Sequence, residues 1–508
     1  MKGSRKVLLG AVSNWLRFIV AAIVALLLVP VMTRSFGGER YGLWILSSSL
    51  LGFLQSLDAG FGAGTVKWTA ESRSPEEAGR RDELLSTSLA VHLAASTIGT
   101  VAVLVLSMLF SGIFSIPGNL ASEGSTLFLL LGLRVTAVGI PAGFLRGLVF
   151  GSDRLFLLNS VQIISSVAYG AAVWGLLNSG VGTIGVAAAG LGLSALEMAA
   201  VYLAARRAMK QNETPIRLSL RRISMARFRE AFSYSGSSFM VQVASAILMQ
   251  SDLIILKFFA PLAVVAGYGV AGRAAEYGFI LVKQAVNALT PSIARLDPAK
   301  EPEKTRFFLT NASKYSGAMA GSIAVASWSL GGPLLAAWAG PGYDAYGTIL
   351  GILTTAFVII SVQLPCAAYL TLKGDHVWAS RVMSSSALVN LAVSIILAFA
   401  LGAIGIALGT LVASLLIDGI VLPLRAYHSI GLKGRDLLLR VWFKLVIPAA
   451  FQFAAMYGLA LLLPSRDLGT IAIIGAIGIA VFAASFALLS LDRSERRLFF
   501  GGRRKASS

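Results

Sequence analysis

Long apolar runs separated by short polar segments dominate the chain. A helix needs about 20 apolar residues to cross a hydrocarbon core roughly 30 Å thick. Fourteen such runs can be read in the sequence, with approximate limits 8–32, 41–65, 85–110, 122–145, 155–177, 182–205, 233–258, 261–288, 313–339, 346–370, 379–400, 402–424, 445–464 and 468–490. The pattern predicts an all-α polytopic membrane protein with about fourteen transmembrane helices.

The longest polar segment, about 206–232, divides the runs into six and eight. Its apolar residues fall near one face of a helix with arginines on the others: Ile216, Leu220, Ile223 and Phe228. This arrangement is typical of an amphipathic helix lying on the inner leaflet of a membrane. A solvated basic linker is the alternative interpretation.

A weak internal similarity suggests how the runs are grouped. Tyr41-Gly42 opens the second run, and Tyr268-Gly269 lies in the eighth. Two-lobe transporters are commonly built from such repeats, although a chance match between apolar segments is the alternative. We therefore expect two six-helix lobes and two further C-terminal helices. The expected parts are an N-lobe at 1–205, a basic amphipathic linker at 206–232, a C-lobe at 233–427, helices 13 and 14 at 428–491 and a basic tail at 492–508.

Composition excludes several classes of protein. Hydrophobic residues make up 56% of the chain and charged residues only 13%, against about 25% charged in a soluble domain. A soluble enzyme or a disordered chain is therefore excluded. The single cysteine, Cys366, excludes an intrachain disulfide, and the three histidines lie far apart in the sequence. We expect no metal site and no cofactor.

The basic residues are distributed very unevenly. With the N-terminus placed in the cytoplasm, thirty-six fall in cytoplasmic segments and three, Arg34, Arg40 and Arg466, on the other side. Cytoplasmic loops of membrane proteins carry this excess, so we expect both termini in the cytoplasm. The net charge of +19 then reflects loops that face anionic lipids, and no nucleic-acid partner is expected. The first run is too long for a cleaved signal peptide, so we expect an uncleaved span.

Three arginines lie inside apolar runs: Arg17, Arg134 and Arg273. A charge at the bilayer centre costs about 2.5–3.5 kcal/mol or more, so such a residue faces a cavity or a partner. Arginine stays charged when desolvated and holds phosphate through two parallel hydrogen bonds. A cavity with two or three arginines suits an anionic, phosphate-bearing substrate.

Four acids lie well inside the runs, Asp58, Asp252, Glu276 and Asp418, whereas Glu197 is nearer an inner end. They are candidates for ion coupling or gating. Structural roles are the alternative, because Arg273 and Glu276 are neighbours on one helix face and can pair. Arg17 and Asp58 lie on adjacent runs and can do the same, and the other acids can accept local hydrogen bonds.

Glycine is abundant, with 52 residues. Gly405 and Gly409 form a small-xxx-small pattern in the twelfth run, which predicts close helix packing.

No catalytic signature is present. The glycine-rich segment Gly60-Phe-Gly-Ala-Gly64 lacks the Lys-Ser/Thr of a phosphate-binding loop and follows no strand. Every outer connection is short, which leaves no room for a catalytic domain outside the membrane. We expect a protein that is not an enzyme and has no catalytic residues.

Several segments together resemble Wzx-type polysaccharide flippases. Phe36-Gly-Gly-Glu-Arg-Tyr41-Gly42, followed by Leu57-Asp58-Ala-Gly60-Phe-Gly62, resembles their opening. Gln250-Ser-Asp252, with Tyr268-Gly269 and Pro291 beyond it, resembles the start of their second lobe, and Gly402-Ala-Ile-Gly405-Ile-Ala-Leu-Gly409 their twelfth span. The resemblance extends over nearly the whole chain. The wider superfamily also contains lipid II flippases and multidrug and toxin extruders.

This resemblance implies a fourteen-helix, two-lobe transporter of the bacterial inner membrane. It would flip a polyprenyl-pyrophosphate-linked oligosaccharide from the cytoplasmic to the outer leaflet by alternating access, beside proteins of glycan assembly. In the family, spans 1, 2, 7 and 8 line a cationic central cavity. Arg17 and Arg273 lie on spans 1 and 8 and are the first candidates to bind the anionic head. Arg134 lies on span 4, outside that set.

Three other functions stay open. A multidrug extruder of the same fold would couple transport through the membrane acids. A membrane glycosyltransferase, polymerase or ligase acting on lipid-linked sugars is a different class, which the short outer connections disfavour. A membrane scaffold without transport activity would need none of the arginines.

Overall fold

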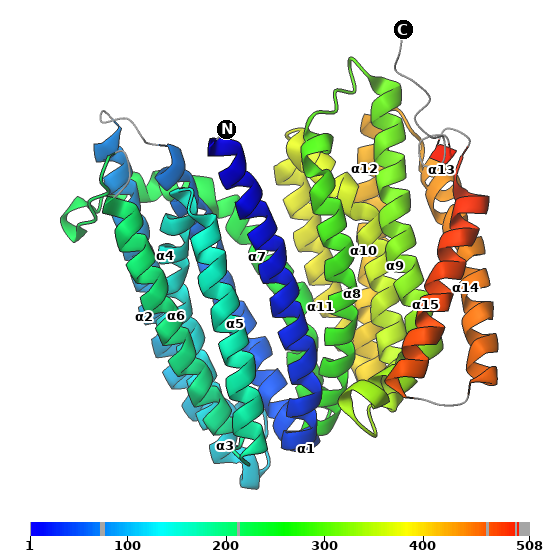
Figure 1. Cartoon of the computed structure of the whole chain (residues 1–508), viewed down its shortest axis with the longest axis horizontal. Coiled ribbons are helices and arrows are strands. Elements are labelled where there is room, and N and C mark those ends of the chain that lie inside the picture. Colours follow the sequence, from blue (N-terminus) through cyan, green and yellow to red (C-terminus); the bar gives the residue numbers. More distant parts are fainter. Residues whose placement is uncertain (1, 72–76, 211–213, 464–466, 493–494, 497–508) are drawn as a thin grey trace. The chain divides into compact units, whose positions relative to one another are not determined.

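The computed structural model describes the chain except for residues 1, 72–76, 211–213, 464–466, 493–494 and 497–508. The side chains of residues 2–8, 11, 56–61, 71, 220, 231–241 and 244 also lie outside the described part. All regular structure in the described residues is helical (Figure 1). This confirms the predicted all-α class.

The first half of the chain contains α1 (Lys2–Glu71), α2 (Ala78–Ile113), α3 (Gly118–Leu133), the π-helix η1 (Arg134–Gly139), α4 (Ile140–Gly151), α5 (Leu155–Asn178), α6 (Thr183–Lys210), the 3₁₀ turn η2 (Leu220–Arg222) and α7 (Met225–Phe259). The second half contains α8 (Leu262–Ala294), α9 (Pro302–Ala339), the 3₁₀ turn η3 (Asp344–Tyr346), α10 (Gly347–Leu372), α11 (His376–Ala413), the π-helix η4 (Ser414–Val421), α12 (Leu422–Ser429), α13 (Gly434–Leu437), the π-helix η5 (Leu438–Trp442), α14 (Phe443–Leu462), α15 (Leu468–Ser485) and the π-helix η6 (Phe486–Ser490).

Contacts divide the chain into two compact units, Met1–Ala266 and Gly267–Ser508. Helix α7 belongs to the first unit, where it packs on α1. The Ser49 hydroxyl there donates a hydrogen bond to the Gln250 carbonyl at 2.6 Å. The sequence places this segment in a C-lobe that begins at 233, and that division into lobes stays a prediction.

Two glycines break helices that otherwise run on without a loop. Gly37 in α1 has φ +73°, and Gly402 in α11 has φ +55°. Backbone in this region is accessible mainly to glycine, so the chain can turn sharply at both points. Each of these helices therefore carries two of the predicted spans.

Ten helical stretches of the described residues are long and apolar enough to cross a membrane. Two of them, Val12–Gln55 and His376–Ser429, contain the glycine breaks and hold two predicted spans each. Helices α7 and α8 fall outside this set but have 35 and 33 residues. Each of the fourteen predicted spans thus coincides with a helical segment, in agreement with the predicted polytopic fold.

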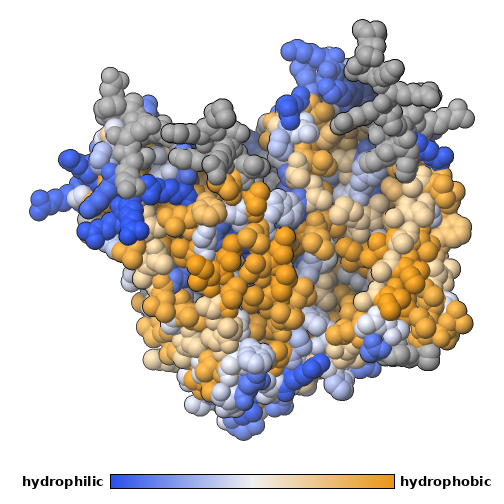
Figure 2. All heavy atoms as spheres, in the orientation of Figure 1, coloured by the Kyte–Doolittle hydropathy of each residue, from blue (hydrophilic) through white to orange (hydrophobic). Residues whose placement is uncertain are grey.

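The surface of the helices is unusually apolar. Met108 is 82% exposed, Phe399 78% and Leu462 77%, within a much larger set of exposed apolar side chains. Figure 2 shows apolar side chains along the middle of the helices and hydrophilic side chains at their ends. Soluble monomers rarely expose such a surface, so the helices are suited to contact with lipid.

The predicted amphipathic helix at 206–232 does not form. Helix α6 continues to Lys210 and α7 begins at Met225, and between them the described residues hold only the short turn η2. Ile216 is 7% exposed and packs with Trp68, Phe144 and Val201 in the core of the first unit. The expectation of one continuous surface helix is therefore wrong: Ile216 enters the protein core, whereas Ile223 is 45% and Phe228 36% exposed.

A buried arginine anchors this linker to the start of α2. The Arg81 side chain is 0% exposed and donates hydrogen bonds to the Thr214 carbonyl at 3.1 Å and the Pro215 carbonyl at 3.1 Å. Asp82 accepts from Arg81 at 3.0 Å and from the Arg222 guanidinium at 2.9 Å. The alternative of a freely solvated linker is also wrong. The buried Arg81 and Asp82 need partners, and the linker supplies them through Thr214, Pro215 and Arg222.

A second cluster of charges ties the start of α7 to α2. Glu230 pairs with Arg80, and it accepts a hydrogen bond from Arg227 at 3.0 Å. The hydrogen bond from Arg80 lowers the pKa of Glu230 below its ordinary value, with a smaller contribution from Arg227. Glu230 therefore stays ionised in the neutral range.

Candidate functional site

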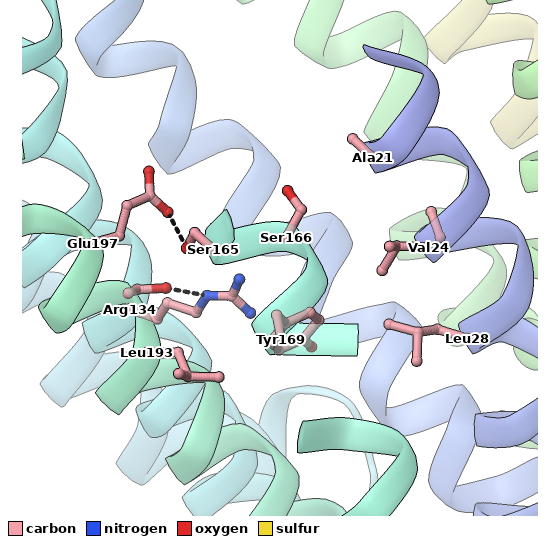
Figure 3. A pocket seen from close by; sticks show the side chains of 11 residues that line it. Ala21, Val24, Leu28, Arg134, Ser165, Ser166, Tyr169, Leu193 and Glu197 are labelled. Atoms are coloured by element: carbon pink, nitrogen blue, oxygen red, sulfur yellow. Dashed lines mark hydrogen bonds between the residues drawn. The ribbon is translucent and has the colours of Figure 1, made fainter. Parts of the chain in front are cut away.

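A small pocket inside the first unit contains one of the predicted arginines (Figure 3). We name it the arginine pocket. Its volume is about 190 Å³, and it is lined by Ala21, Val24, Ala25 and Leu28 of α1, Arg134 of η1, Ser165, Ser166 and Tyr169 of α5, and Leu193, Ser194 and Glu197 of α6. Apolar side chains of α1 face the polar side chains of the other three elements (Figure 3). Four segments distant in sequence thus form one site.

Arg134 is held in this pocket from two sides. Its Nε donates to the Ser194 hydroxyl at 2.9 Å, and its guanidinium carbon lies 4.7 Å from the centre of the Tyr169 ring. A cation over an aromatic face is attracted by the negative face of the ring. Gly190 makes room for this stack, because a Cβ there would lie 3.1 Å from the arginine Nη1.

The local backbone supports the position of Arg134. The residue begins η1, a six-residue π-helix between α3 and α4. Single π-helical turns within longer helices occur frequently at functional sites. The Thr136 side chain of the same turn is 0% exposed and donates to the Gly132 carbonyl at 2.9 Å, which fixes the turn from within.

Glu197 brings a negative charge to the same pocket. Its Oε2 accepts a hydrogen bond from Ser165 at 2.8 Å, and its Oε1 lies 3.7 Å from Arg146 Nη1. Arg146 also donates to the Gly139 carbonyl at 3.2 Å. The pocket is therefore lined by one guanidinium group and one carboxylate, and Arg146, which lies outside the lining, pairs with that carboxylate.

Arg17 lies on α1 one turn before Ala21, the first pocket residue on that helix. Its side chain is half-buried and donates from Nη2 to Asn14 Oδ1 at 3.1 Å. Its Nε is buried and has no hydrogen-bond partner among the described residues. A buried donor without a partner costs free energy, and the role of Arg17 in substrate binding stays a prediction.

Arg273 and Glu276 pair on α8 in the second unit. Arg273 Nη1 lies 2.7 Å from Glu276 Oε2, and the side chains are 41% and 35% exposed. The predicted alternative of an i, i+3 pair is thus present in the structure. Both side chains are partly exposed, and their roles in substrate binding and gating stay predictions.

The other three acids have separate surroundings. Asp418, in η4, is 5% exposed and accepts a hydrogen bond from Ser386 at 2.9 Å. Asp252, in α7, is 8% exposed. Asp58 lies on α1, and its side chain is outside the described residues. The roles of these acids in coupling or gating stay predictions.

The sequence analysis does not identify most of the arginine pocket. Tyr169 and the serines of α5 carry no sequence signal of their own, although Ser165 and Tyr169 share a helix face at i, i+4 spacing. The sequence places Arg146 in a cytoplasmic segment between two predicted spans, whereas in the structure it lies on α4 beside Glu197. Among the described residues, no group of three or more histidines, cysteines, aspartates or glutamates could hold a metal ion.

Solved structures with the same fold are membrane transporters. A lipid II flippase MurJ in an inward closed conformation matches with a TM-score of 0.71 and 15% identity, covering 95% of this chain and 99% of that one. An inward-facing multidrug resistance MATE family transporter matches with a TM-score of 0.62 and 16% identity, covering 80% and 98%. The fold therefore defines the class of this chain as a polytopic protein built like the transporters of the MOP superfamily.

A third solved structure also shares this fold. It is a superfamily transporter from Pyrococcus furiosus, described as having a binding pocket of reversed polarity, with a TM-score of 0.54 and 17% identity over 84% of this chain and 95% of that one.

No curated protein matches the chain. Residues 7–297 match the polysaccharide biosynthesis protein family, and the chain belongs to that family.

Proposed function

We propose that this protein flips a polyprenyl-pyrophosphate-linked oligosaccharide from the cytoplasmic to the outer leaflet of the bacterial inner membrane. The observation that carries the proposal is membership in the polysaccharide biosynthesis family over residues 7–297. The likeness to a lipid II flippase over 95% of the chain supports it, because that relative is named for a lipid-linked substrate. Both termini lie in the cytoplasm in this proposal.

The chemistry of the substrate explains why arginines are needed. A pyrophosphate-sugar head does not cross hydrocarbon unaided, because removing its charges from water is prohibitive. Arginine replaces the lost water with charge-assisted hydrogen bonds. Arg17 is half-buried and its Nε has no hydrogen-bond partner among the described residues, and Arg273 is 41% exposed beside Glu276. We assign these two residues to the head, with Arg134 as a third candidate.

The size of the arginine pocket limits what Arg134 can bind. At about 190 Å³ the pocket lies below the roughly 300–1,000 Å³ of typical ligand sites. It can accept one phosphate group, but not a sugar chain as well. In this proposal the protein undergoes alternating access and performs no covalent chemistry, and the lipid tail stays in the bilayer.

Leaflet exchange in proteoliposomes tests the proposal. A fluorescent polyprenyl-pyrophosphate oligosaccharide should exchange only when the protein is present. Arg17→Ala and Arg273→Ala should each slow exchange by about tenfold or more, because a hydrogen bond to a charged group contributes about 1.5–3 kcal/mol. Arg440→Ala is a matched control, since that arginine is 59% exposed and pairs with Asp436 on its own helix face.

Three outcomes would contradict parts of the proposal. Exchange that is unchanged in both variants would leave the flippase and remove the arginine assignment. Efflux of a lipophilic cation without any lipid exchange would favour the multidrug extruder. A protein that unfolds at its normal temperature but shows neither lipid exchange nor cation efflux would favour a membrane scaffold.

A further inference from the structure

A second and larger pocket lies in the first unit, at the ends of its helices away from the linker that joins α6 to α7. We name it the outer pocket, since the distribution of basic residues predicts that this end faces outward. Its volume is about 610 Å³, and it is lined by Ser35, Phe36, Arg40, Ser122, Glu123, Leu177, Gly180, Val181, Gly182, Thr183, Ile184 and Gly185. A volume of this size falls within the roughly 300–1,000 Å³ range of ligand sites.

Glu123 is the centre of the polar groups in this pocket. Arg40 Nε donates to both of its carboxylate oxygens, at 3.1 and 3.0 Å, and the Thr183 hydroxyl donates to Oε1 at 2.5 Å. Three helices, α1, α3 and α6, each contribute one of these residues. The Arg40 side chain is 54% exposed and lines the pocket, so these groups can be reached from the hollow.

The backbone around the pocket is shaped to leave it open. Gly37, with φ +73°, ends the first half of α1 and turns the chain beside Phe36. Gly180, with φ +77°, turns the chain between α5 and α6. No atom lies within 4 Å of a Cβ placed at Gly180 or Gly182, so the wall is bare backbone next to empty space.

The charges of the pocket limit the ligands that it can take. The Arg40 guanidinium and the Glu123 carboxylate offset each other's charge, so the pair gives the pocket no net charge to favour an anion or a cation. Hydroxyls from Ser35, Ser122 and Thr183 add groups that both donate and accept hydrogen bonds. A neutral polyhydroxylated molecule, whose hydroxyls also do both, matches this set without separating the ion pair.

We propose that the outer pocket binds a neutral saccharide unit. The inference deepens the proposed function and rests on it: the pocket receives sugars of the lipid-linked oligosaccharide on the outer side, whereas the arginines hold the pyrophosphate. It also gives a binding role to Phe36 and Arg40 of the Phe36–Gly42 segment.

Glycan binding by the full chain in detergent tests this inference separately from transport. The probe is an array of neutral and acidic oligosaccharides of mixed composition, immobilised without lipid or phosphate. The wild-type protein should be retained on a subset of the neutral glycans. Glu123→Ala should reduce this retention by about tenfold or more, since it removes the hub of the polar groups.

A second variant keeps the test valid if Glu123→Ala fails to fold. Gly182→Phe fills the pocket without removing any contact, because nothing lies within 4 Å of its Cβ position, and it should reduce retention to a similar extent. Gly192→Phe is the matched control, since Gly192 is an exposed helical glycine of α6 that is equally open and lies outside the pocket. Its retention should equal that of the wild type.

Several results would overturn the inference. They are no retention on any neutral glycan, retention on acidic glycans alone, or retention that both pocket variants leave unchanged. The saccharide site and the flippase function can be refuted separately, the first by the glycan array and the second by the lipid exchange assay. Glycan binding without lipid exchange would refute the proposed flippase and keep the saccharide site, and exchange without glycan binding would do the reverse.

Discussion

Lys314 and Glu495 form a buried ion pair in the second unit. Each residue is about 1% exposed, and Lys314 Nζ lies 2.6 Å from Glu495 Oε1. The Tyr315 hydroxyl donates to the same carboxylate at 2.5 Å, and the Asp492 backbone N–H donates to it at 2.7 Å. From the sequence alone, Lys314 is counted among the basic residues of a cytoplasmic segment, and Glu495 belongs to the basic tail. Their partnership spans most of the second unit and carries no local signal.

Removing one member of this pair should be far more damaging than removing an exposed lysine. Lys314→Ala leaves Glu495 buried without its cation, which costs about 3–5 kcal/mol. We expect the thermal unfolding midpoint in detergent to fall by about 5 °C or more at a fixed scan rate. Lys304→Ala is the control, because its side chain is 66% exposed and pairs with Glu301, and it should change stability by about 0.5 kcal/mol or less.

A double replacement separates lost pairing from lost packing. Lys314→Met combined with Glu495→Leu removes both charges, and it should recover most of the stability lost in the single variant. A Lys314→Ala protein as stable as the wild type would show that the pair is dispensable.

At the scale of elements, the prediction from the glycine pattern agrees with the structure, and the prediction for the linker does not. The Gly405 and Gly409 spacing predicts close packing, and Gly409 indeed lies against Ser394 of the preceding span. The apolar positions of the linker instead predict a surface helix, which is wrong. The difference is physical: a small residue allows close approach wherever it stands, whereas Ile216 could be buried in lipid or in protein, and only the fold decides which.

The close approach at Gly409 can be tested with a single methyl group. A Cβ at this position would lie 2.2 Å from Ser394 Oγ and 2.6 Å from its Cα. Gly409→Ala should therefore destabilise the second unit by about 1–3 kcal/mol through overpacking. The measurement is the fraction of monodisperse protein recovered by size-exclusion chromatography after heating in steps.

Gly458→Ala serves as the control for that experiment, because no atom lies within 4 Å of a Cβ at Gly458. It should leave the recovery unchanged or improve it slightly, since alanine is a better helix former than glycine. Equal recovery of the two variants would argue against tight packing at Gly409.

At the scale of the whole molecule, the sequence makes a definite prediction about orientation. The predicted cytoplasmic segments hold thirty-six basic residues and the outer segments three, which places both termini in the cytoplasm.

The chain suits a cysteine-labelling test, because Cys366 is 0% exposed and should not react. Ser122→Cys in the outer pocket should react with an impermeant maleimide in intact cells. Lys300→Cys, at a position 84% exposed in the wild type, should react only after the membrane is permeabilised. The opposite labelling would reverse the proposed direction of transport.

The sequence by itself determined the class, the helical segments and the predicted topology of this protein. These properties depend on composition and on apolar runs long enough to span a bilayer, and both are local quantities. Membership in the polysaccharide biosynthesis family, indicated by short motifs such as Phe36–Gly42, was also within reach of the sequence.

The tertiary structure alone decided which polar groups meet. The stacking of Arg134 on Tyr169, the hydrogen bonds between Arg40, Glu123 and Thr183, and the burial of Arg81 all join segments distant in the chain. A single charged residue inside an apolar run has the same sequence signature whether it pairs, lines a pocket or anchors a linker. Its role depends on the side chains that packing brings within hydrogen-bond distance, and sequence spacing does not encode that contact.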